Sequence, residues 1–444
     1  MEGSDMSLAG RVLIPSTTSS KILYGALLVL AMGVGCLSAR GQTVLVPPVQ
    51  IGEEAPSVGT ASSNLVGSAN APLLARPAGA TTYPLEYGPL HFHPHLAYQF
   101  VWADGLLAGT NNSATTRIQT ISPGVFTELG RHWNLDASAS FNQYSSKEFS
   151  DNTGIYIALS GHVPREDWTW NFGYKGTRTD ETQVETGTQI LQWEHLATAS
   201  GHYFINARLS LEVNGTGDMR LTDDSDPTSS LSDSYTASTL EWLNFRATTH
   251  TTFGIGAGGG YTLLPGSRPG EEDVDWVFEN LKARIVWQPG PKLTAQISGG
   301  GQWQQFFITN ANNTLVPVYA GNIVYQLFES TTLGLTASRE VEASYQRDRY
   351  TEATVVRFSV RQRLFKNFYL SVQPSYDLRS YRDTFGDHAE VQKDKYLSVY
   401  TSLSTTLFKK LHLSAFYVYS DNNSTQDTLS FQSDQVGFRV DYRY

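Results

Sequence analysis

Hydrophobic and polar residues alternate with a period of two along most of the chain from His93 onward. In the segment 396–408, for example, Leu397, Leu403 and Leu407 fall on one face, while serines, threonines and tyrosines fall on the other. A period of two is typical of a β-strand, because successive side chains point to opposite faces of a sheet. The pattern predicts an all-β protein.

Segments of about ten residues, rich in aromatic and β-branched side chains, recur between turn residues, as in a transmembrane antiparallel up-and-down β-barrel. We count eighteen segments. Sixteen is the alternative, because the proline in Ser122-Pro123-Gly124 removes a hydrogen-bond donor from its strand. The predicted strands are 94–105, 116–128, 133–144, 152–162, 168–178, 189–201, 204–214, 236–247, 250–262, 275–287, 292–304, 317–328, 332–342, 353–365, 368–381, 395–408, 411–420 and 431–444.

The connections between these segments are short and long in turn. Lys366-Asn367 is a short one, and 215–235, which contains several aspartates, is the longest. Outer-membrane barrels have short periplasmic turns and longer outer loops, whereas a soluble β-sandwich has no reason to separate two classes of connection. We therefore expect the long connections, including 215–235, to face the outside of the cell.

The last predicted strand alternates apolar and polar residues and ends on an aromatic side chain. A final amphipathic strand of this kind is a feature that outer-membrane barrels share at the barrel-assembly machinery. Phe438, Tyr442 and Tyr444 are therefore the predicted assembly signal, and this machinery is an expected partner. Other aromatic residues, such as Trp287 and Trp303, lie near strand ends, where amphipathic rings form the interfacial girdles of a barrel.

The N-terminal residues 1–41 are predicted to be a cleaved signal peptide. The apolar stretch 22–35 is short for a membrane-spanning helix, and Ala39-Arg40-Gly41 provides the small residues that signal peptidase requires. The alternative is a lipoprotein that is lipidated at Cys36, although Gly33 stands where a bulky aliphatic residue is usual. Either route predicts localisation in the outer membrane of a Gram-negative-type bacterium.

Residues 42–89 are rich in alanine, glycine, serine and proline and show no sustained period. This composition predicts a flexible periplasmic linker. Residues 90–444 then form the barrel, so the predicted organisation is a signal peptide, a linker and one barrel domain.

Composition and charge exclude several classes of protein. The chain has 444 residues, a formal net charge of −10 and a mean hydropathy of −0.28. It is too polar for a bundle of membrane helices, although not for a barrel, where only every second strand residue faces lipid. Its negative charge argues against nucleic acid as a partner. Its one cysteine lies in the predicted signal peptide, which excludes a disulfide framework and a thiolate metal site in the mature chain.

Charged residues recur on the polar faces of several predicted strands. A lysine or arginine that faces lipid at mid-depth costs about 2–4 kcal/mol, so these residues are expected to face the lumen. They either line a water-filled channel or pair across a narrow interior and brace the wall. The lumen-lining candidates are Arg357, Arg361, Arg363, Lys282, Arg284, Asp377, Arg379, Arg439, Asp441 and Arg443.

Catalytic and metal-binding patterns are sparse. No Gly-x-Ser-x-Gly motif is present, and the acidic pairs lie in predicted loops, where solvated charge is usual. His91, His93 and His95 alternate and would share a face, a spacing that zinc or copper sites use. No further ligand accompanies them, so we predict no metal, no other cofactor and no enzymatic activity.

The chain resembles the porin-like outer-membrane β-barrel proteins. The likeness rests on the segments 88–96 and 118–124, the loop 184–189 and the ending 436–444, and it extends over the barrel. The likeness concerns architecture, that of a barrel in contact with outer-membrane lipid. Because eighteen strands leave an aqueous lumen unless something fills it, the charged inner face favours a channel for passive or weakly selective diffusion of small hydrophilic solutes. A more distant likeness to eighteen-strand barrels of polysaccharide export leaves an export conduit with periplasmic partners as an alternative. A closed structural or adhesive barrel that acts through its outer loops is another.

Overall fold

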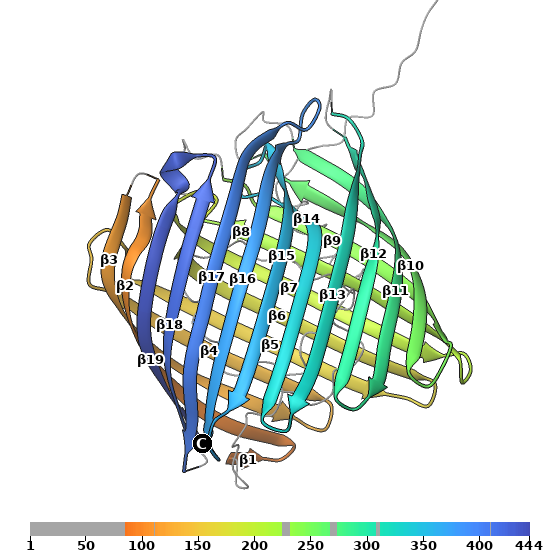
Figure 1. Cartoon of the computed structure of the whole chain (residues 1–444), viewed down its shortest axis with the longest axis horizontal. Coiled ribbons are helices and arrows are strands. Elements are labelled where there is room, and N and C mark those ends of the chain that lie inside the picture. The colour runs from red at the N-terminus through yellow and green to blue at the C-terminus, as the bar shows by residue number, and fades with distance from the viewer. Residues whose placement is uncertain (1–84, 111, 224–230, 267–272, 308–310, 409) are drawn as a thin grey trace, which may run out of the picture.

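The computed structural model describes residues 85–444 except 111, 224–230, 267–272, 308–310 and 409. These described residues form a closed antiparallel β-barrel (Figure 1). The predicted signal peptide, residues 1–41, and most of the predicted linker lie outside the described residues. No helix in the described part of the chain is long and apolar enough to cross a membrane.

Eighteen strands close the barrel, which confirms the predicted fold class and the predicted strand count. Each strand pairs antiparallel with the next one along the chain, and the last strand, β19, pairs with β2. The strands are β2 (Leu90–Gly109), β3 (Asn112–Leu129), β4 (Trp133–Tyr144), β5 (Asn152–Pro164), β6 (Trp168–Thr182), β7 (Gln189–Phe204), β8 (Leu209–Thr222), β9 (Ser234–Arg246), β10 (Thr251–Leu264), β11 (Val274–Gly290), β12 (Leu293–Phe306), β13 (Thr314–Phe328), β14 (Thr331–Ala343), β15 (Arg349–Arg363), β16 (Phe368–Asp383), β17 (Glu390–Leu407), β18 (Leu411–Ser424) and β19 (Phe431–Arg443), with a short 3-10 helix, η1 (Asp427–Leu429), before β19.

The end of the predicted linker has a defined structure. Leu85–Tyr87 form the short strand β1, which pairs with the beginning of β2. The turn between them contains Gly88, whose φ of +60° is a left-handed conformation that glycine adopts without steric cost. The predicted linker therefore ends in a strand that adds to the barrel wall.

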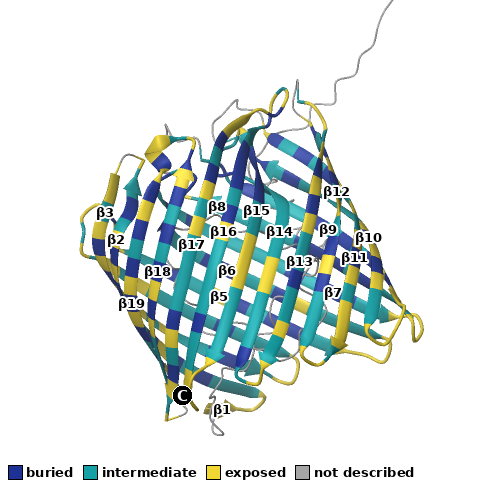
Figure 2. Cartoon of the chain, viewed as in Figure 1, coloured by how far each residue is buried: buried dark blue, intermediate teal, exposed yellow. Residues whose placement is uncertain are grey.

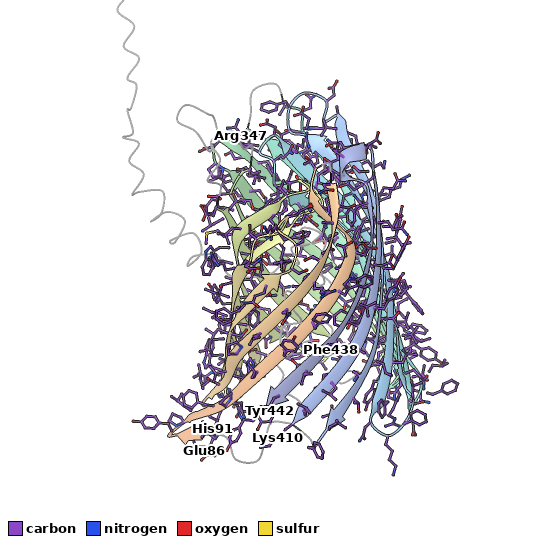
Figure 3. All side chains as sticks on the ribbon, turned by 90° about the vertical axis from the view of Figure 1, so that its left-hand side faces the viewer. Glu86, His91, Arg347, Lys410, Phe438 and Tyr442 are labelled. Atoms are coloured by element: carbon purple, nitrogen blue, oxygen red, sulfur yellow. The ribbon has the colours of Figure 1, made fainter. Side chains whose placement is uncertain are left out.

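The connections fall into two classes by position (Figure 1). Short turns such as Glu329-Ser330 lie at the end of the barrel that also has β1 and the C-terminus, and we call it the turn end. Longer loops such as 344–348 lie at the opposite end, which we call the loop end. Figure 3 shows His91 at the turn end and Arg347 at the loop end.

Large apolar side chains are exposed on the outer face of the barrel, and exposed and buried positions alternate along many of its strands (Figure 2). Along β10, Phe253 and Ile255 are exposed, while Gly254 and Gly256 between them are buried. Ile255 and Leu281 are 68% and 65% exposed. Large apolar side chains that face outward all around a closed sheet are the arrangement of a barrel in contact with lipid, because a soluble protein rarely exposes so large an apolar surface.

Several strands extend further toward the loop end than the sequence pattern predicts. β8 continues to Thr222, so Asp218, which was expected in the acidic loop 215–235, lies in a strand opposite Leu196 of β7. An aspartate is tolerated there because it lies on the inner face, away from lipid. Residues 224–230 of the same loop, which include two of its aspartates, lie outside the described residues.

The doubtful strand at Ser122-Pro123-Gly124 is part of the barrel. β3 pairs through it with β2, where Pro123 lies opposite Leu96. On its other side, the ladder between β3 and β4 omits Ser122 and Pro123 and resumes at Gly124. The proline interrupts one ladder locally and leaves the strand intact, so the alternative count of sixteen is wrong.

The closing seam between β19 and β2 is packed with aromatic rings. Phe438 stacks on Phe100 at 5.7 Å between ring centroids, on the outer face of the seam. Tyr442 and Tyr444 also face outward, at 44% and 37% exposure. The assembly role of these β19 aromatics stays a prediction.

Substitution of Gly437 should prevent proper closure of this seam. A Cβ atom at Gly437 would lie 2.4 Å from Cζ of Phe416 and 2.5 Å from the Phe100 carbonyl oxygen. We expect Gly437→Val to lower the fraction of folded, heat-modifiable barrel in electrophoresis, because the side chain forces β19 away from β2. Gly290→Val is the matched control, since a Cβ atom there meets nothing within 4 Å. Equal folded fractions for the two variants would contradict this expectation.

Candidate functional site

The register of the sheet defines one continuous inner face, because residues that pair across antiparallel strands point to the same side. One row runs from Arg363 through Tyr369, Ser404 and Ser414 to Arg439. Followed around the barrel, the register places all ten charged residues that we singled out in the sequence on this face. They are Arg357, Arg361, Arg363, Lys282, Arg284, Asp377, Arg379, Arg439, Asp441 and Arg443.

Arg284 is the centre of a buried polar cluster on the wall formed by β8 to β11. Its Nη2 donates to Glu212 Oε2 and to Asn244 Oδ1, both at 2.7 Å. Its guanidinium lies 4.2 Å from the centroid of the Trp242 ring, and Arg284 is only 3% exposed. A buried arginine needs such a set of partners, because an unpaired buried charge is strongly destabilising.

Two glycines of β10 make room for this cluster. A Cβ atom at Gly254 would lie 2.7 Å from Asn244 Oδ1, and one at Gly256 would lie 2.7 Å from the Trp242 ring. The indole and the guanidinium therefore spread over β10 only because both positions lack a side chain. The glycine-rich sequence of this strand serves close packing on the inner face.

Two other predicted residues are paired in the same way. Arg379 Nε donates to Asp377 Oδ2, and its Nη1 donates to Glu342 Oε2, both at 3.3 Å. Arg439 holds Asp441 through two contacts of its Nε, at 2.8 and 2.9 Å. Of these side chains, Arg379, Asp377, Arg439 and Asp441 are buried. At these two places on the wall, the opposite charges neutralise each other and hold neighbouring side chains in position.

The arginines of β15 have a different environment. Arg357 and Arg363 are exposed, and Arg361 is half-buried with its guanidinium 4.7 Å from the centroid of the Tyr369 ring. Because all three lie on the inner face, water inside the barrel reaches them. They form a positive column along the interior, and we call it the arginine column.

The three histidines of β2 share the inner face near the turn end, as their spacing indicates. Each lies close to a carboxylate: His95 Nε2 is 3.2 Å from Asp136, His93 Nε2 is 3.6 Å from Glu128, and the third, His91, is 3.8 Å from Glu86. Within the described residues, no group of three or more His, Cys, Asp or Glu side chains is arranged to hold a metal ion. The histidines act as partners of the carboxylates along the seam, where Arg443 lies opposite His95.

Two hairpins leave the wall at the loop end. The ladder between β5 and β6 ends at Ile155 and Arg178, although β6 continues to Thr182 with β7 alone. In the same way, the ladder between β13 and β14 ends at Tyr319 and Arg339, while β14 continues to Ala343 with β15 alone. β14 follows β6 by eight strands in the ring of eighteen, so these hairpins stand on nearly opposite walls.

The tips of these hairpins meet, and we call their junction the clasp. Glu185, from the loop after β6, accepts a hydrogen bond from the Tyr345 backbone N–H at 3.1 Å and another from the Ser344 hydroxyl. Arg220 of β8 donates to the Ser344 carbonyl, and its guanidinium lies 3.9 Å from the centroid of the Tyr345 ring. Burial raises the pKa of Glu185, while the Ser344 hydroxyl and the nearby Arg220 oppose that shift.

Apolar contacts hold the clasp on both sides. Val184, beside Glu185, is fully buried in a cluster with Leu107, Phe149 and Phe431 from the loop ends of other strands. On the other side, Tyr350 of β15 packs with Trp276 and Phe306 on the inner faces of β11 and β12. The sequence pattern predicts these residues in loops or strands but does not predict that they meet, since loop sequences have no period that indicates a partner.

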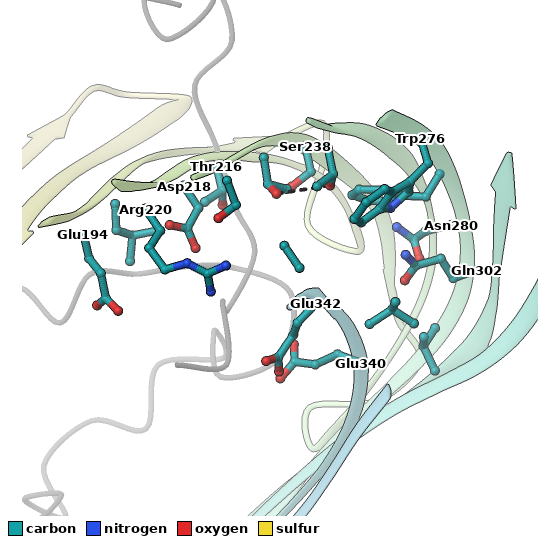
Figure 4. Close-up of a pocket in the computed structure, with 18 of the residues that line it drawn as sticks. Glu194, Thr216, Asp218, Arg220, Ser238, Trp276, Asn280, Gln302, Glu340 and Glu342 are labelled. Carbon is teal, nitrogen blue, oxygen red and sulfur yellow. Dashed lines mark hydrogen bonds between the residues drawn. The ribbon is translucent and has the colours of Figure 1, made fainter. Parts of the chain in front are cut away.

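A cavity lies inside the barrel beside the clasp (Figure 4). Its lining comes from β6 to β14 and includes Lys175, Arg220, Lys282 and Glu340. Figure 4 shows Glu340 and Glu342 on one wall, with Asp218 and Arg220 across the open space. The interior at this level is therefore narrowed by the clasp, polar, and lined by charges of both signs.

Comparison with known proteins gives structural similarities only. No family model and no curated protein matches the chain. Among solved structures, the chain is similar to the outer membrane channel DcaP of Acinetobacter baumannii, with 10% identity, coverage of 80% of this chain and 97% of that chain, and a TM-score of 0.42. It is similar to OccK3 (OpdO) of Pseudomonas aeruginosa, with 10% identity, coverage of 80% and 95%, and a TM-score of 0.40. It is also similar to the siderophore receptor PirA of Pseudomonas aeruginosa, with 11% identity, coverage of 82% and 81%, and a TM-score of 0.39.

The architecture itself identifies the class of protein. In this closed antiparallel barrel each of the eighteen strands pairs with a neighbour on both sides, and the wall presents an apolar outer surface and a charged inner face. Only helices and closed barrels can satisfy the backbone in lipid, and this polarity is the reverse of that of a soluble β-protein. The chain is an eighteen-stranded β-barrel of the outer-membrane type, and it resembles the porin-like proteins in architecture.

Proposed function

We propose that this barrel is a porin-like channel for the passive or weakly selective diffusion of small hydrophilic solutes. The observation that supports it most is the arginine column, Arg357, Arg361 and Arg363, which faces water inside the barrel. An eighteen-strand barrel is wide enough for an aqueous lumen, and charged residues on its inner face tune which ions or acids enter.

The proposal includes an orientation in the membrane. The turn end, with its short connections and the C-terminus, faces the periplasm, and the loop end faces the outside, as in other outer-membrane barrels. A signal peptide over residues 1–41 would direct export, and the assembly machinery would insert the barrel. Solutes from outside would then pass the clasp before they reach the cavity and the arginine column.

The clasp favours small solutes over a polymer. Hairpins from nearly opposite walls are joined across the loop end by Glu185, Ser344 and Tyr345, all of them buried. A polysaccharide chain would require these contacts to open along its whole passage, whereas a small solute requires only the space beside them. We therefore favour the channel over the two alternatives, a polysaccharide conduit and a closed adhesive barrel.

Neutralising the arginine column should change ion selectivity. We expect the triple variant Arg357→Gln, Arg361→Gln, Arg363→Gln to shift the reversal potential in a KCl gradient toward cation preference, because the column attracts anions in the lumen. The measurement is planar-bilayer recording of purified protein. Arg131→Gln, Arg165→Gln and Arg208→Gln together form the control, since they remove the same charge from exposed turns.

Two results would count against the channel. One is the absence of any conductance from the folded wild-type barrel. The other is a triple variant that no longer folds, together with single variants that fold and retain the wild-type reversal potential. The arginines would then brace the wall.

A further inference from the structure

Most of the charged side chains that line the cavity already interact within the barrel. Glu342 accepts a hydrogen bond from Arg379, Glu194 accepts one from Gln192 at 3.0 Å, and Arg220 donates to the Ser344 carbonyl. The Lys175 ammonium lies 5.6 Å from the centroid of the Tyr156 ring, and Asp218 also has an interaction partner. These charges are committed to the wall and the clasp.

Lys282 of β11 and Glu340 of β14 are different. Both line the cavity, and neither makes a hydrogen bond or a direct ion pair with any residue that the structure describes. The positive charges of Lys282 and Arg379 both act on the Glu340 carboxylate, and neither residue makes a hydrogen bond or ion pair with it. A partly enclosed cavity therefore presents one ammonium and one carboxylate whose polar atoms have only water or a ligand to bind.

The register places the two charges at the ends of one row. Lys282 lies opposite Gly300 of β12, and Gly300 lies opposite Val318 of β13. The ladder between β13 and β14 ends one position earlier, at Tyr319 and Arg339, so Val318 is level with Glu340. Two inter-strand spacings, about 10 Å, separate the Cα atoms of Lys282 and Val318 along the wall, and Glu340 lies beyond Val318 on β14, where the hairpin has left the ladder with β13.

The residues on the barrel wall between Lys282 and Glu340 have small side chains or none. Gly300 has no side chain, and a Cβ atom there would lie 1.9 Å from the Leu281 carbonyl oxygen. Val318 is small and apolar. On the side toward the loop end, Phe278 of β11 adds an apolar wall to the cavity. The space between ammonium and carboxylate is therefore open above and bordered by apolar groups.

The chemistry of this space selects for a solute with both charges. A simple anion would be attracted by Lys282 and repelled by Glu340 and Glu342, and a simple cation would meet the reverse. A small zwitterion places its carboxylate on Lys282 and its ammonium on Glu340, so both unpaired groups gain a charge-assisted hydrogen bond. Its apolar part then lies along Val318 and Phe278.

We propose that the row from Lys282 to Glu340 is a binding subsite for small zwitterionic solutes of the α-amino-acid class. The subsite rests on the proposed channel function, since its ligand must enter the lumen, and it names the solute class that the channel favours.

Equilibrium binding to the full-length folded barrel in detergent micelles tests the subsite. The probes are alanine, lactate, which lacks the ammonium, and ethylamine, which lacks the carboxylate. We expect alanine to bind more tightly than either single-charge probe. Lys282→Gln and Glu340→Gln should each weaken alanine binding by about tenfold or more, because a hydrogen bond between charged groups is lost. The measurement is isothermal titration calorimetry.

A charge reversal and two matched controls exclude a merely structural effect. The double variant Lys282→Glu, Glu340→Lys should restore alanine binding relative to either single variant, since the two charges only change places. Lys366→Gln and Glu166→Gln, in exposed turns, should leave it unchanged. Folding of each variant is checked by heat modifiability.

The outcomes for the subsite and for the channel are separate. The subsite is wrong if wild-type protein does not bind alanine, if it binds lactate or ethylamine equally well, or if the folded single variants bind alanine as the wild type does. Swelling of liposomes that contain the barrel tests the channel on its own. Alanine binding that requires Lys282 and Glu340, in a barrel that admits no solute, would retain the subsite and reject the channel.

Discussion

Replacing Glu185 with alanine should raise the single-channel conductance of the barrel. Its carboxylate joins the two hairpins through the Tyr345 N–H and the Ser344 hydroxyl, and both tips are buried. Hydrogen bonds to a charged group contribute about 1.5–3 kcal/mol. Their loss should increase the open fraction of the clasp by about tenfold or more, so that solutes pass more often. The measurement is planar-bilayer recording of wild type and variant under the same salt conditions.

Thr186→Ala is the matched control for this experiment. Thr186 belongs to the same loop, but its side chain bonds only to Thr188 within that loop. We expect its conductance to equal that of the wild type. If Glu185→Ala leaves conductance and its fluctuations unchanged while the protein folds, the clasp does not restrict the entrance.

Replacing Arg284 with methionine should strongly destabilise the folded barrel. The substitution keeps much of the side-chain length, but it removes the hydrogen bonds that Arg284 donates to Glu212 and Asn244, both buried, and leaves Glu212 only the one from Asn214. It also removes the cation from the Trp242 ring. Removing one partner of a buried ion pair costs about 3–5 kcal/mol. We expect a correspondingly lower midpoint in urea-induced unfolding, followed by the change in tryptophan fluorescence of the barrel in micelles.

A second variant separates the unpaired charge from the loss of packing. Adding Glu212→Gln to Arg284→Met removes the stranded carboxylate, so the double variant should regain part of the lost stability. Arg363→Met, at an exposed position of the arginine column, should change the midpoint little. The alternative outcome is that the double variant loses as much stability relative to Arg284→Met as Glu212→Gln alone loses relative to the wild type. That result would show that Glu212 and Arg284 do not act as a pair.

The barrel could be predicted from the sequence because its main determinant is local. Alternation within each strand decides which side chains face lipid, and it placed Arg284 and Asp377 on polar faces without any knowledge of the neighbouring strands. Strand ends were less predictable. Asp218 was expected in a loop because acidic residues usually are, yet the polar lumen accepts it in a strand.

The partners of these residues could not be predicted in the same way. Arg284 and Glu212 are 72 positions apart and meet only because the register of three ladders brings Arg284 level with Ser210, the inner-facing position next to Glu212 on β8. The contact also depends on Gly254 and Gly256 of β10, and nothing in the sequence of that strand indicates which side chains fill the space above them. The clasp depends on loop residues 159 and 160 positions apart, with no periodic signal at all.

The departure of β14 from β13 has a consequence for the depth of the barrel in its membrane. Beyond Tyr319 and Arg339, within the described residues, no hydrogen bond joins Thr314–Val318 to Glu340–Ala343. Two unzipped strand edges cannot lie in hydrocarbon, where unsatisfied N–H and C=O groups cost several kcal/mol each. The apolar layer must therefore end at or below the rung of Tyr319. Measured from there to the turn end, Tyr319–Phe328 and Thr331–Arg339 match the 9–11 residues that a tilted strand needs to cross a bilayer. The point where the hairpin turns inward thus marks the membrane–water interface at the loop end of the barrel.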